Sequence, residues 1–376
     1  MRRRFRLSAC AVALGLSLTL SACGANAGGG DAAGEETTSG QSDAPLGKVG
    51  VILPETASSA RWEGFDKPML EEALRAKGFD PDIQNAQGDV QKFSTLADGM
   101  IAQGVKVLII SSINSEIGGA VAAKAQAAGI PTIDYDRLNL GGSSEYYVSF
   151  DNVRVGELQG EGLAEALDGE RGAEVIEIEG APTDHNATLF HEGQRNVLQP
   201  LYDSGELELV RSQPIDDWNN QEGGRVFEQI LTSNGGEVDG VVAANDGLAS
   251  AVITVLKKYG LNGKVPVTGQ DATAEGLRAI LRGDQYMTVF KPVKEEAEAT
   301  AELAAALVNG DESAAERVAT DSVEDPQGKR EVRAVLLEPY LITKDNVKQV
   351  VDEGYVSADD ICTRDLADVC SELGIE

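Results

Sequence analysis

The chain has 376 residues, of which 25% are charged and only 5% are aromatic, and its formal net charge at pH 7 is −30. The length is sufficient for two domains that each have a hydrophobic core. A surface this acidic repels nucleic acids and anionic lipids, so it argues against nucleic acid as a partner and for an uncharged or cationic ligand.

The N-terminus has the pattern of an export signal. Four arginines between residues 2 and 6 precede an apolar stretch, Ala9 to Leu20, that is too short to be a stable membrane-spanning anchor. The stretch ends in Leu20-Ser21-Ala22-Cys23, which resembles the lipobox of bacterial lipoproteins. We therefore expect a signal peptide over residues 1–22 and a lipid anchor on Cys23. An ordinary secretory signal with a chance cysteine is the alternative.

A low-complexity stretch follows this signal. Residues 23–45 are dominated by Gly, Ala, Ser, Thr, Asp and Glu and contain almost no large apolar side chain. Such a composition predicts a flexible linker between the membrane anchor and the folded part, which we expect to begin near Leu46.

Strand and helix signals then alternate along the chain. The expected strands span residues 49–53, 82–84, 107–111, 130–137, 146–150, 173–178, 207–212, 241–244, 265–269, 286–290 and 332–337. The expected helices span residues 62–76, 90–103, 116–128, 155–167, 187–198, 223–231, 248–259, 275–281 and 293–308. Repeated βαβ units predict parallel, doubly wound sheets, and the strands are too many for one sheet. We therefore predict an α/β protein with two Rossmann-like lobes.

Polar residues recur directly after the predicted strands. Asp136 and Arg137 stand at the end of the strand 130–137, where a surface ion pair is the simpler interpretation. In open α/β sheets, however, the carboxyl ends of strands are where ligands bind. The equivalent residues at other strand ends are Arg61, Asp184, Asn186, Asn245, Asp271 and Lys291. These side chains offer the hydrogen-bond donors and acceptors that are needed to bind adjacent hydroxyl groups of a ligand. The pattern therefore predicts a neutral polyhydroxylated ligand.

The two tryptophans of the chain, Trp62 and Trp218, also lie in these loops, and an indole face can cover the apolar face of a sugar ring. Each residue has a structural alternative. The tryptophans could pack loops onto the body of the protein. Asp184, Asn186 and Asn245 could be helix N-caps.

Neither a metal nor a cofactor is expected. The histidines His185 and His191 are six residues apart and do not share a helix face, so they do not form a metal site together. Cys362 and Cys370 lie in the exported part of the chain, where an oxidising environment favours a local disulfide. Because a straight helix would hold their Cα atoms about 12 Å apart, the segment between them must fold back.

Several ordered strings resemble the sugar-binding proteins of ABC transporters, of the type that binds xylose or several monosaccharides. They are Ser59-Ala60-Arg61-Trp62, Tyr135-Asp136-Arg137-Leu138, Ser149-Phe150-Asp151-Asn152, Gly180-Ala181-Pro182-Thr183-Asp184-His185-Asn186-Ala187, Gly269-Gln270-Asp271-Ala272 and Met287-Thr288-Val289-Phe290-Lys291-Pro292. The resemblance runs from about Lys48 to Tyr355.

The resemblance implies a type I periplasmic binding protein whose chain crosses three times between two lobes, near Asp151, Lys291 and Leu337. Residues 46–150 and 292–337 would form the N-terminal lobe, and residues 151–291 and 338–376 the C-terminal lobe and tail. The ligand-binding residues implied are Arg61, Trp62, Asp136, Arg137, Asp184, Asn186, Trp218, Asn245, Asp271 and Lys291. Phe290, His185 and Ala244 depart from the family pattern and leave the identity of the sugar open.

From these features we expect a monomeric receptor, lipid-anchored on the outer face of the cytoplasmic membrane, that delivers a monosaccharide to an ABC permease and its ATPase. D-xylose is the first choice, and glucose, galactose and arabinose are the alternatives. A secreted glycosidase or sugar isomerase that uses Asp136 and Asp271, or a receptor that docks on a sensor protein, remains a further alternative.

Overall fold

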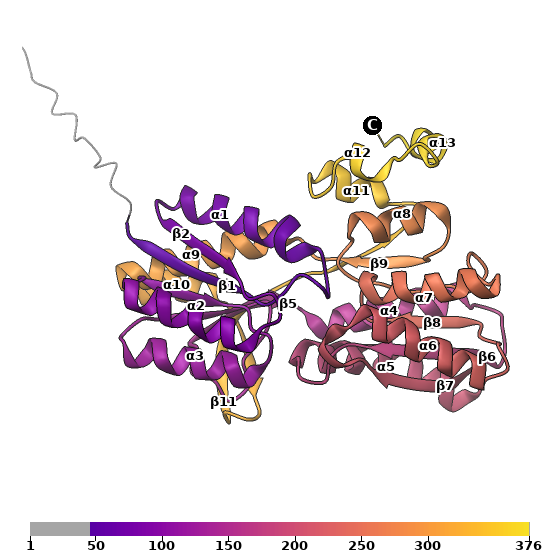
Figure 1. Cartoon of the computed structure of the whole chain (residues 1–376), viewed down its shortest axis with the longest axis horizontal. Helices are drawn as coiled ribbons and strands as arrows, with labels where there is room; N and C mark the ends of the chain where they lie inside the picture. The colour runs from indigo at the N-terminus through magenta and orange to yellow at the C-terminus, as the bar shows by residue number, and fades with distance from the viewer. Residues whose placement is uncertain (1–45, 376) are drawn as a thin grey trace, which may run out of the picture. The chain divides into compact units, whose positions relative to one another are not determined.

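The computed structural model describes residues 46–375 of the chain (Figure 1). The expected signal peptide over residues 1–22, the lipidation site Cys23 and the linker over residues 23–45 lie outside this part. None of the helices in the described part is long and apolar enough to cross a membrane.

The first lobe is built on a seven-stranded sheet with the strand order β10-β11-β5-β4-β3-β1-β2 (Figure 1). The strands are β1 (Lys48–Leu53), β2 (Asp80–Asn85), β3 (Val107–Ile110), β4 (Thr132–Tyr135), β5 (Tyr146–Phe150), β10 (Asp321–Asp325) and β11 (Arg330–Leu337). All neighbours pair in parallel except β10 and β11. The central strands β3, β4 and β5 are buried along their whole length because helices cover both faces of the sheet.

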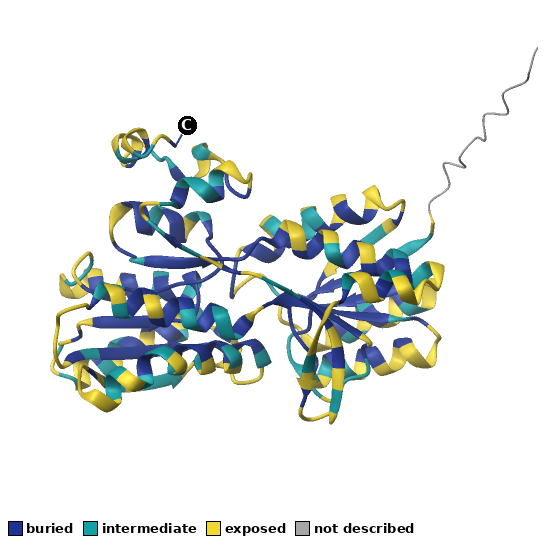
Figure 2. Cartoon of the chain, turned by 180° about the vertical axis from the view of Figure 1, so that it is seen from behind, coloured by how far each residue is buried: buried dark blue, intermediate teal, exposed yellow. Residues whose placement is uncertain are grey.

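Alternation along β1 shows how the two faces are filled. Val49, Val51 and Leu53 pack into the core beneath α1 and α9, whereas Ile52 packs beneath α2 and α3 on the other face. The helices of this lobe are α1 (Lys67–Ala76), α2 (Val90–Gln103), α3 (Ser115–Ala127), α9 (Val293–Asn309) and α10 (Glu312–Val318). Their inward sides are buried and their outward sides exposed (Figure 2).

The second lobe is built on a three-stranded parallel sheet with β6 (Ala173–Glu179) in the middle, flanked by β7 (Leu207–Pro214) and β8 (Gly240–Ala243). A separate antiparallel pair, β9 (Met287–Phe290) and β12 (Tyr340–Thr343), extends this lobe. Its helices are α4 (Asn152–Ala166), α5 (His185–Ser204), α6 (Asn220–Ser233), α7 (Asp246–Tyr259) and α8 (Ala274–Arg282).

The chain connects the lobes three times: between β5 and α4, between β9 and α9, and between β11 and β12. The predicted α/β fold with two lobes and three crossings is therefore confirmed. The first connection is fixed locally by Asp151, whose side chain accepts a hydrogen bond from the backbone N–H of Arg154 and so begins α4.

Three features differ from the prediction. The expected strand over residues 265–269 is reduced to one bridge between Val241 and Val267, because Pro266 has no backbone N–H to donate to a neighbouring strand. The pairs β10–β11 and β9–β12 are antiparallel, whereas alternating βαβ units suggested parallel pairing throughout. The helix expected from Trp62 begins as a π-helical segment, η1 (Trp62–Asp66), before α1.

The C-terminal tail consists of α11 (Val347–Asp352), α12 (Ala358–Ile361) and α13 (Ala367–Glu372). It shares a core with α8 and β9, to which Val350, Ile361 and Cys370 contribute. Cys362 and Cys370 form a disulfide with a Cα–Cα distance of 5.9 Å, so the chain between them folds back instead of forming one straight helix.

Candidate functional site

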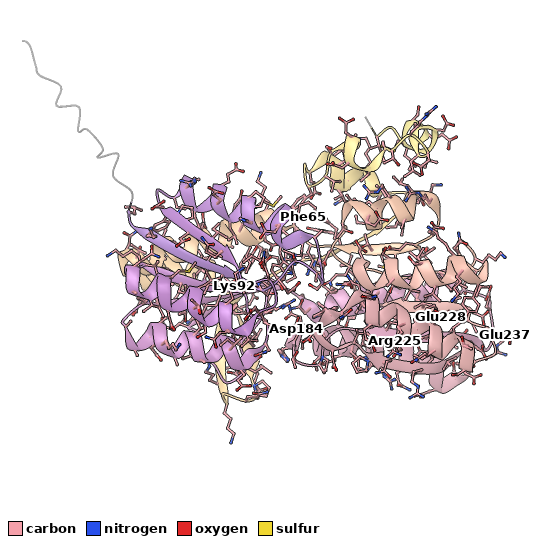
Figure 3. The ribbon with its side chains drawn as sticks, in the orientation of Figure 1. Phe65, Lys92, Asp184, Arg225, Glu228 and Glu237 are labelled. Atoms are coloured by element: carbon pink, nitrogen blue, oxygen red, sulfur yellow. A yellow bond between two sulfur atoms is a disulfide. The ribbon has the colours of Figure 1, made fainter. Side chains whose placement is uncertain are left out.

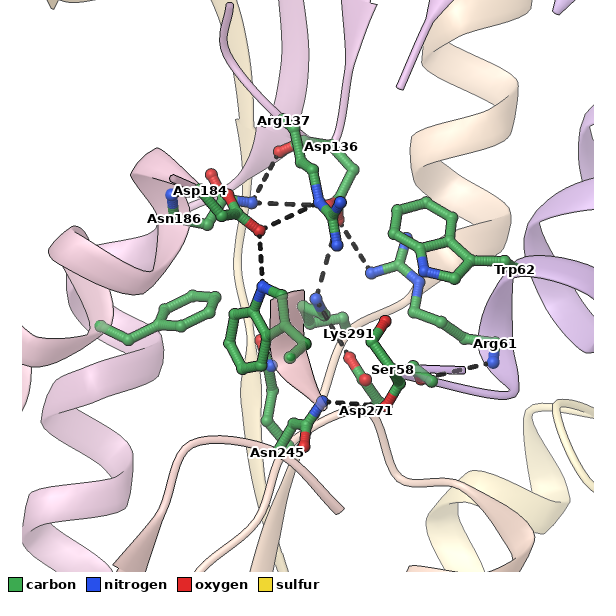
Figure 4. A pocket seen from close by; sticks show the side chains of 14 residues that line it. Ser58, Arg61, Trp62, Asp136, Arg137, Asp184, Asn186, Asn245, Asp271 and Lys291 are labelled. Atoms are coloured by element: carbon green, nitrogen blue, oxygen red, sulfur yellow. Dashed lines mark hydrogen bonds and ion pairs between the residues drawn. The ribbon is translucent and has the colours of Figure 1, made fainter. Parts of the chain in front are cut away.

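A pocket lies where polar loops of the two lobes meet (Figure 4). Its free internal volume is about 30 Å³, roughly the space of one water molecule, because paired side chains from both lobes fill most of it. It is lined by Ser58, Ser59, Arg61, Trp62, Asp136, Arg137, Asp184, Asn186, Phe190, Trp218, Asn245, Gln270, Asp271 and Lys291. All ten residues expected from the sequence to bind a ligand therefore line one pocket.

Arg61 is the most heavily paired cation of the site. Its Nε and Nη2 atoms contact both oxygens of Asp66, at 2.8 and 2.5 Å, while Nη1 lies 2.8 Å from Asp136 Oδ2. A fourth contact, of 3.2 Å, joins Nη2 to Glu296 on α9. With so many charge-assisted bonds, the guanidinium is held in one orientation.

The buried acids around Arg61 differ in their protonation. Burial would raise the pKa of Asp136, but the cations of Arg61, Lys291 and Arg137 outweigh burial and lower it. Burial and the nearby Asp136 carboxylate raise the pKa of Glu296 well above its ordinary value, against the opposing effect of Arg61. The pocket therefore presents a charged Asp136, whereas Glu296 beneath it is biased towards the neutral acid.

The backbone at the end of β4 turns sharply to present Asp136. This residue has a φ of +61°, in the left-handed region that glycine adopts freely and that other residues, Asn and Asp more often than most, adopt rarely. The turn is held by three donors to the Asp136 carbonyl oxygen: the hydroxyl groups of Tyr147 and Ser149 and the side-chain amide of Asn186. Asn186 comes from the second lobe, so this bond also joins the lobes across the pocket.

Two ion pairs complete the charged lining. Arg137 Nε lies 3.0 Å from Asp184 Oδ2 of the second lobe, and Lys291 Nζ lies 3.2 Å from Asp271 Oδ1. Lys291 is also 3.7 Å from Asp136 Oδ2, so it stands between carboxylates of both lobes. Asp184 is therefore at the junction of the lobes, as Figure 3 also shows.

The N-cap alternative holds for Asp184 and Asn245, but not for Asn186, which is the second residue of α5. Asp184 accepts a hydrogen bond from Asn186 N, and Asn245 accepts one from Leu248 N, so both are helix N-caps. The remaining atoms of each cap face the pocket: Asp184 Oδ2 meets Arg137 and Trp218, and Asn245 Nδ2 donates to the Ser58 carbonyl oxygen at 3.2 Å. Capping thus fixes the orientation of these side chains at the rim.

The two tryptophans are held differently. Trp218 donates from Nε1 to Asp184 Oδ2 at 3.1 Å and packs edge-on against Phe190, with ring centroids 6.4 Å apart. Trp62 has its Nε1 buried without a hydrogen-bond partner, and the guanidinium groups of Arg61 and Arg137 lie 4.7 and 5.2 Å from its ring centroid. Its ring is thus held by cation–π contacts.

Four lining residues were absent from the predicted set: Ser58, Ser59, Phe190 and Gln270. Phe190 is four residues after Asn186 on α5 and so shares its face, a spacing that could have revealed it. Ser58, Ser59 and Gln270 stand in the same polar loops as predicted residues. Asp66 and Glu296 were also missed, because they support Arg61 from helices and not from strand ends.

Chemically, the pocket offers three cations and three carboxylates on buried side chains, together with three side-chain amides and aromatic walls. Each hydroxyl group of a ligand can donate to a carboxylate and accept from a cation or amide, so this set suits a small molecule with several adjacent hydroxyls. Elsewhere within residues 46–375, one group of side chains could hold a metal: Glu177, Glu179 and His191, on β6 and α5.

Comparison with known proteins identifies the family. The model of the periplasmic binding protein domain matches residues 49–312, which is more than half of the chain. The chain belongs to the periplasmic binding protein family. Among its relatives is the D-xylose-binding periplasmic protein of Escherichia coli, 34% identical over 309 residues that cover 82% of this chain and 90% of that protein. The multiple sugar-binding periplasmic receptor of Rhizobium radiobacter is 33% identical over 335 residues, covering 85% and 93%.

Solved structures of this family share the fold. An ABC transporter solute-binding protein of Clostridium phytofermentans with bound β-D-glucose superposes with a TM-score of 0.77 at 29% identity, over 84% of this chain and 99% of that one. A carbohydrate transporter solute-binding protein of Chloroflexus aurantiacus in complex with D-glucose gives 0.74 at 30% identity, over 83% and 97%. The family resemblance inferred from the sequence strings is thus confirmed.

Proposed function

We propose that the protein is the substrate-binding component of a sugar ABC importer and holds one monosaccharide in the pocket between its lobes. The observation that carries this proposal is the convergence of all ten predicted side chains, from strand ends of both lobes, on one pocket. The xylose-binding and multiple-sugar-binding names of its relatives support the ligand class, and D-xylose remains our first choice. Glucose, galactose and arabinose are the alternatives.

Binding would replace the ion pairs across the pocket with bonds to sugar hydroxyls. Arg137, Asp184, Asp271 and Lys291 now pair with one another, and a sugar placed among them would accept from the cations and donate to the carboxylates. The closed arrangement of the lobes around the ligand is the form that a permease would recognise.

The N-terminal sequence supports a location at the cell surface. We propose that the chain is exported, cleaved before Cys23 and anchored by lipid to the outer face of the cytoplasmic membrane, where it serves the permease as a monomer. The length of the low-complexity segment, residues 23–45, would let the folded part move between the anchor and the permease.

Titration calorimetry with D-xylose, D-glucose, D-galactose and L-arabinose tests the proposal. Asp271→Ala and Asn186→Ala should each weaken binding of the preferred sugar by about 1–3 kcal/mol, roughly five- to a hundredfold, because a buried hydroxyl loses its partner. Asn196→Ala, an exposed change on the same helix as Asn186, is the matched control and should bind like the wild type. Wild-type affinity in both site variants, or no binding of any monosaccharide, would contradict the proposal.

We further propose that the protein is a binder and not an enzyme. Incubation with xylose and with xylosides, followed by product analysis, should return the sugars unchanged. Turnover that is lost in Asp136→Asn and Asp271→Asn would instead establish a carbohydrate-active enzyme at this pocket.

A further inference from the structure

A second cluster of ligand atoms lies on the face of the β6 sheet that α4 and α5 cover. Glu177 and Glu179 are alternate residues of β6 and so point to the same face, where they are 0% and 5% exposed. His191 reaches them from α5, with its Nδ1 atom 3.4 Å from Glu179 Oε1. One donor atom from each of the three residues lies within 4.8 Å of the others.

The cluster has unused binding capacity. Glu177 Oε1 accepts from the Tyr202 hydroxyl at 2.9 Å, but its Oε2 is buried without any hydrogen-bond partner. The side-chain amide of Gln194 lies 2.8 Å from Glu179 Oε1. Between residues 46 and 375, neither carboxylate forms an ion pair with a lysine or an arginine. Two adjacent buried carboxylates whose one ionic partner in the described part of the chain is a single imidazole are unfavourable, and a bound cation removes that cost.

We propose that Glu177, Glu179 and His191 bind one divalent transition-metal ion, with Zn²⁺ as the ion that best fits the set. Imidazole nitrogen and carboxylate oxygen are both zinc ligands, with bonds of about 2.0–2.2 Å. Ligand atoms around a tetrahedral zinc ion are therefore about 3.4 Å apart. The His191–Glu179 pair has this separation already, and a side-chain shift of roughly 1 Å brings in the third ligand. The His191 side chain is 40% exposed although its Nδ1 atom is buried, so a small rotation of the ring would admit an ion and the water that completes its coordination.

Such an ion would fasten α5 to β6. The N-terminal end of the same helix carries Asp184 as its cap and Asn186 in its first turn, both at the sugar pocket. The metal would therefore stabilise the wall that the second lobe contributes to the sugar pocket. Binding of the metal does not depend on the proposed sugar function. The sequence predicted no metal because His185 and His191 do not share a helix face. In the proposed site His191 is instead joined by two glutamates of the sheet, Glu177 and Glu179.

Zinc titration of the full chain, purified without a histidine tag and treated with EDTA, tests this site. Calorimetry should give one Zn²⁺ per chain with a dissociation constant in the micromolar range or below. His191→Gln and Glu177→Gln should each weaken binding at least tenfold. His185→Gln is the matched control, because it removes the other histidine of the same helix, and it should bind Zn²⁺ like the wild type.

Substitution with Co²⁺ adds a spectroscopic readout. The bound ion should give d–d absorption bands that disappear in His191→Gln. The proposal is overturned if Zn²⁺ shows no saturable binding below millimolar concentration, as expected when the two carboxyl groups only share a proton. It is equally overturned if His191→Gln binds with unchanged affinity. Because His191 is partly exposed, this variant decides the matter even if Glu177→Gln does not fold.

Discussion

Arg137 Nε lies 3.0 Å from Asp184 Oδ2, and this ion pair joins the end of β4 in the first lobe to the beginning of α5 in the second. The same guanidinium donates to the Ser112 carbonyl oxygen at 3.0 Å and lies 3.3 Å from Glu55 Oε1. Arg137 thus uses its planar fork to hold three groups at once.

Arg137→Lys should weaken sugar binding although it keeps the charge. A lysine ammonium cannot bridge Ser112, Glu55 and Asp184 in the way that the fork does. Loss of charge-assisted bonds of this kind amounts to about 1.5–3 kcal/mol, or roughly ten- to a hundredfold in affinity measured by calorimetry. Arg225→Lys, on the exposed side of α6, is the control for an arginine-to-lysine substitution away from the pocket. Unchanged affinity in Arg137→Lys would show that the geometry of the fork is not needed.

Asp66 and Glu296 should respond differently to amide substitution, although both contact Arg61. Asp66 receives two bonds from the guanidinium, so Asp66→Asn leaves a buried cation without its main partner and should destabilise the fold by about 3–5 kcal/mol in denaturant unfolding. The pKa of Glu296 is raised well above its ordinary value by burial, so Glu296→Gln resembles the form already favoured. It should unfold within about 1 kcal/mol of the wild type. Equal losses in the two variants would contradict this distinction.

Gly247→Ala should hinder closure of the lobes without removing any polar group. A Cβ atom on Gly247 would lie 2.7 Å from the Ser58 carbonyl oxygen of the first lobe and 2.5 Å from the side-chain nitrogen of Asn220. Relief of such crowding costs about 1–3 kcal/mol, so sugar affinity should fall about tenfold while the melting temperature without sugar changes little. Gly99→Ala, where no atom lies within 4 Å of the added carbon, is the control and should have no effect. Full affinity in Gly247→Ala would mean that binding does not need this contact.

The stability of Asp134→Asn should depend on pH in a defined way. Burial, opposed by hydrogen bonds from Ser144 and Asn139, raises the pKa of Asp134 to about 6. A raised pKa in the folded state adds stability that is present below the unfolded value near 3.8 and is lost as the pH rises through about 6. The asparagine of the variant does not titrate, so the variant does not lose stability over this pH range for this reason. Its free energy of unfolding relative to the wild type should therefore increase by about 2 kcal/mol between pH 4 and pH 7.

Urea unfolding across this pH range measures that difference. Asp98→Asn removes the same charge from an exposed position of α2 and controls for the change in net charge. A difference for Asp134→Asn that stays constant with pH would contradict the expectation.

Reduction of the tail disulfide should destabilise the protein modestly. The bridge between Cys362 and Cys370 closes a short loop, with a sequence separation of 8 residues. The chain-entropy model gives about 2–3 kcal/mol for a loop of this length. Cys362→Ser with Cys370→Ser should lower the unfolding free energy by that amount, and addition of dithiothreitol to the wild type should reproduce the effect. If dithiothreitol destabilises the double variant equally, the effect does not come from this bridge.

How much could be predicted from the sequence depended on where each residue lies. Asp136, Asn186 and Asp271 were found because the carboxyl ends of parallel strands lie at the same edge of a sheet. A local sequence pattern therefore predicts that residues far apart in the chain lie close together. The sequence did not indicate Asp66 and Glu296 in this way. They lie in helices, where the spacing of residues predicts only which of them share a helix face. The roles of Asp66 and Glu296 towards a ligand, like those of the ten residues predicted from the sequence, stay predictions.

The edges of the sheets and the tail were less predictable. The segments β10 and β12 are short and follow a turn or a loop, so nothing in their composition distinguishes an added antiparallel edge strand from a connection. Pro266 shows a similar limit: its neighbours favour a strand, but the missing N–H leaves a single bridge.

Tyr355 of the tail makes contacts on both sides of the junction. Its ring packs against Phe65 of η1, with centroids 6.2 Å apart, and against Phe290 of β9 at 4.6 Å, while its hydroxyl accepts a hydrogen bond from Lys294 N at the start of α9. Any rotation that separates η1 from β9 must therefore release one of these rings. We therefore expect the resting angle between the lobes, and hence the fraction of molecules ready to admit a ligand, to depend on a side chain more than sixty residues away in sequence from every residue that lines the pocket.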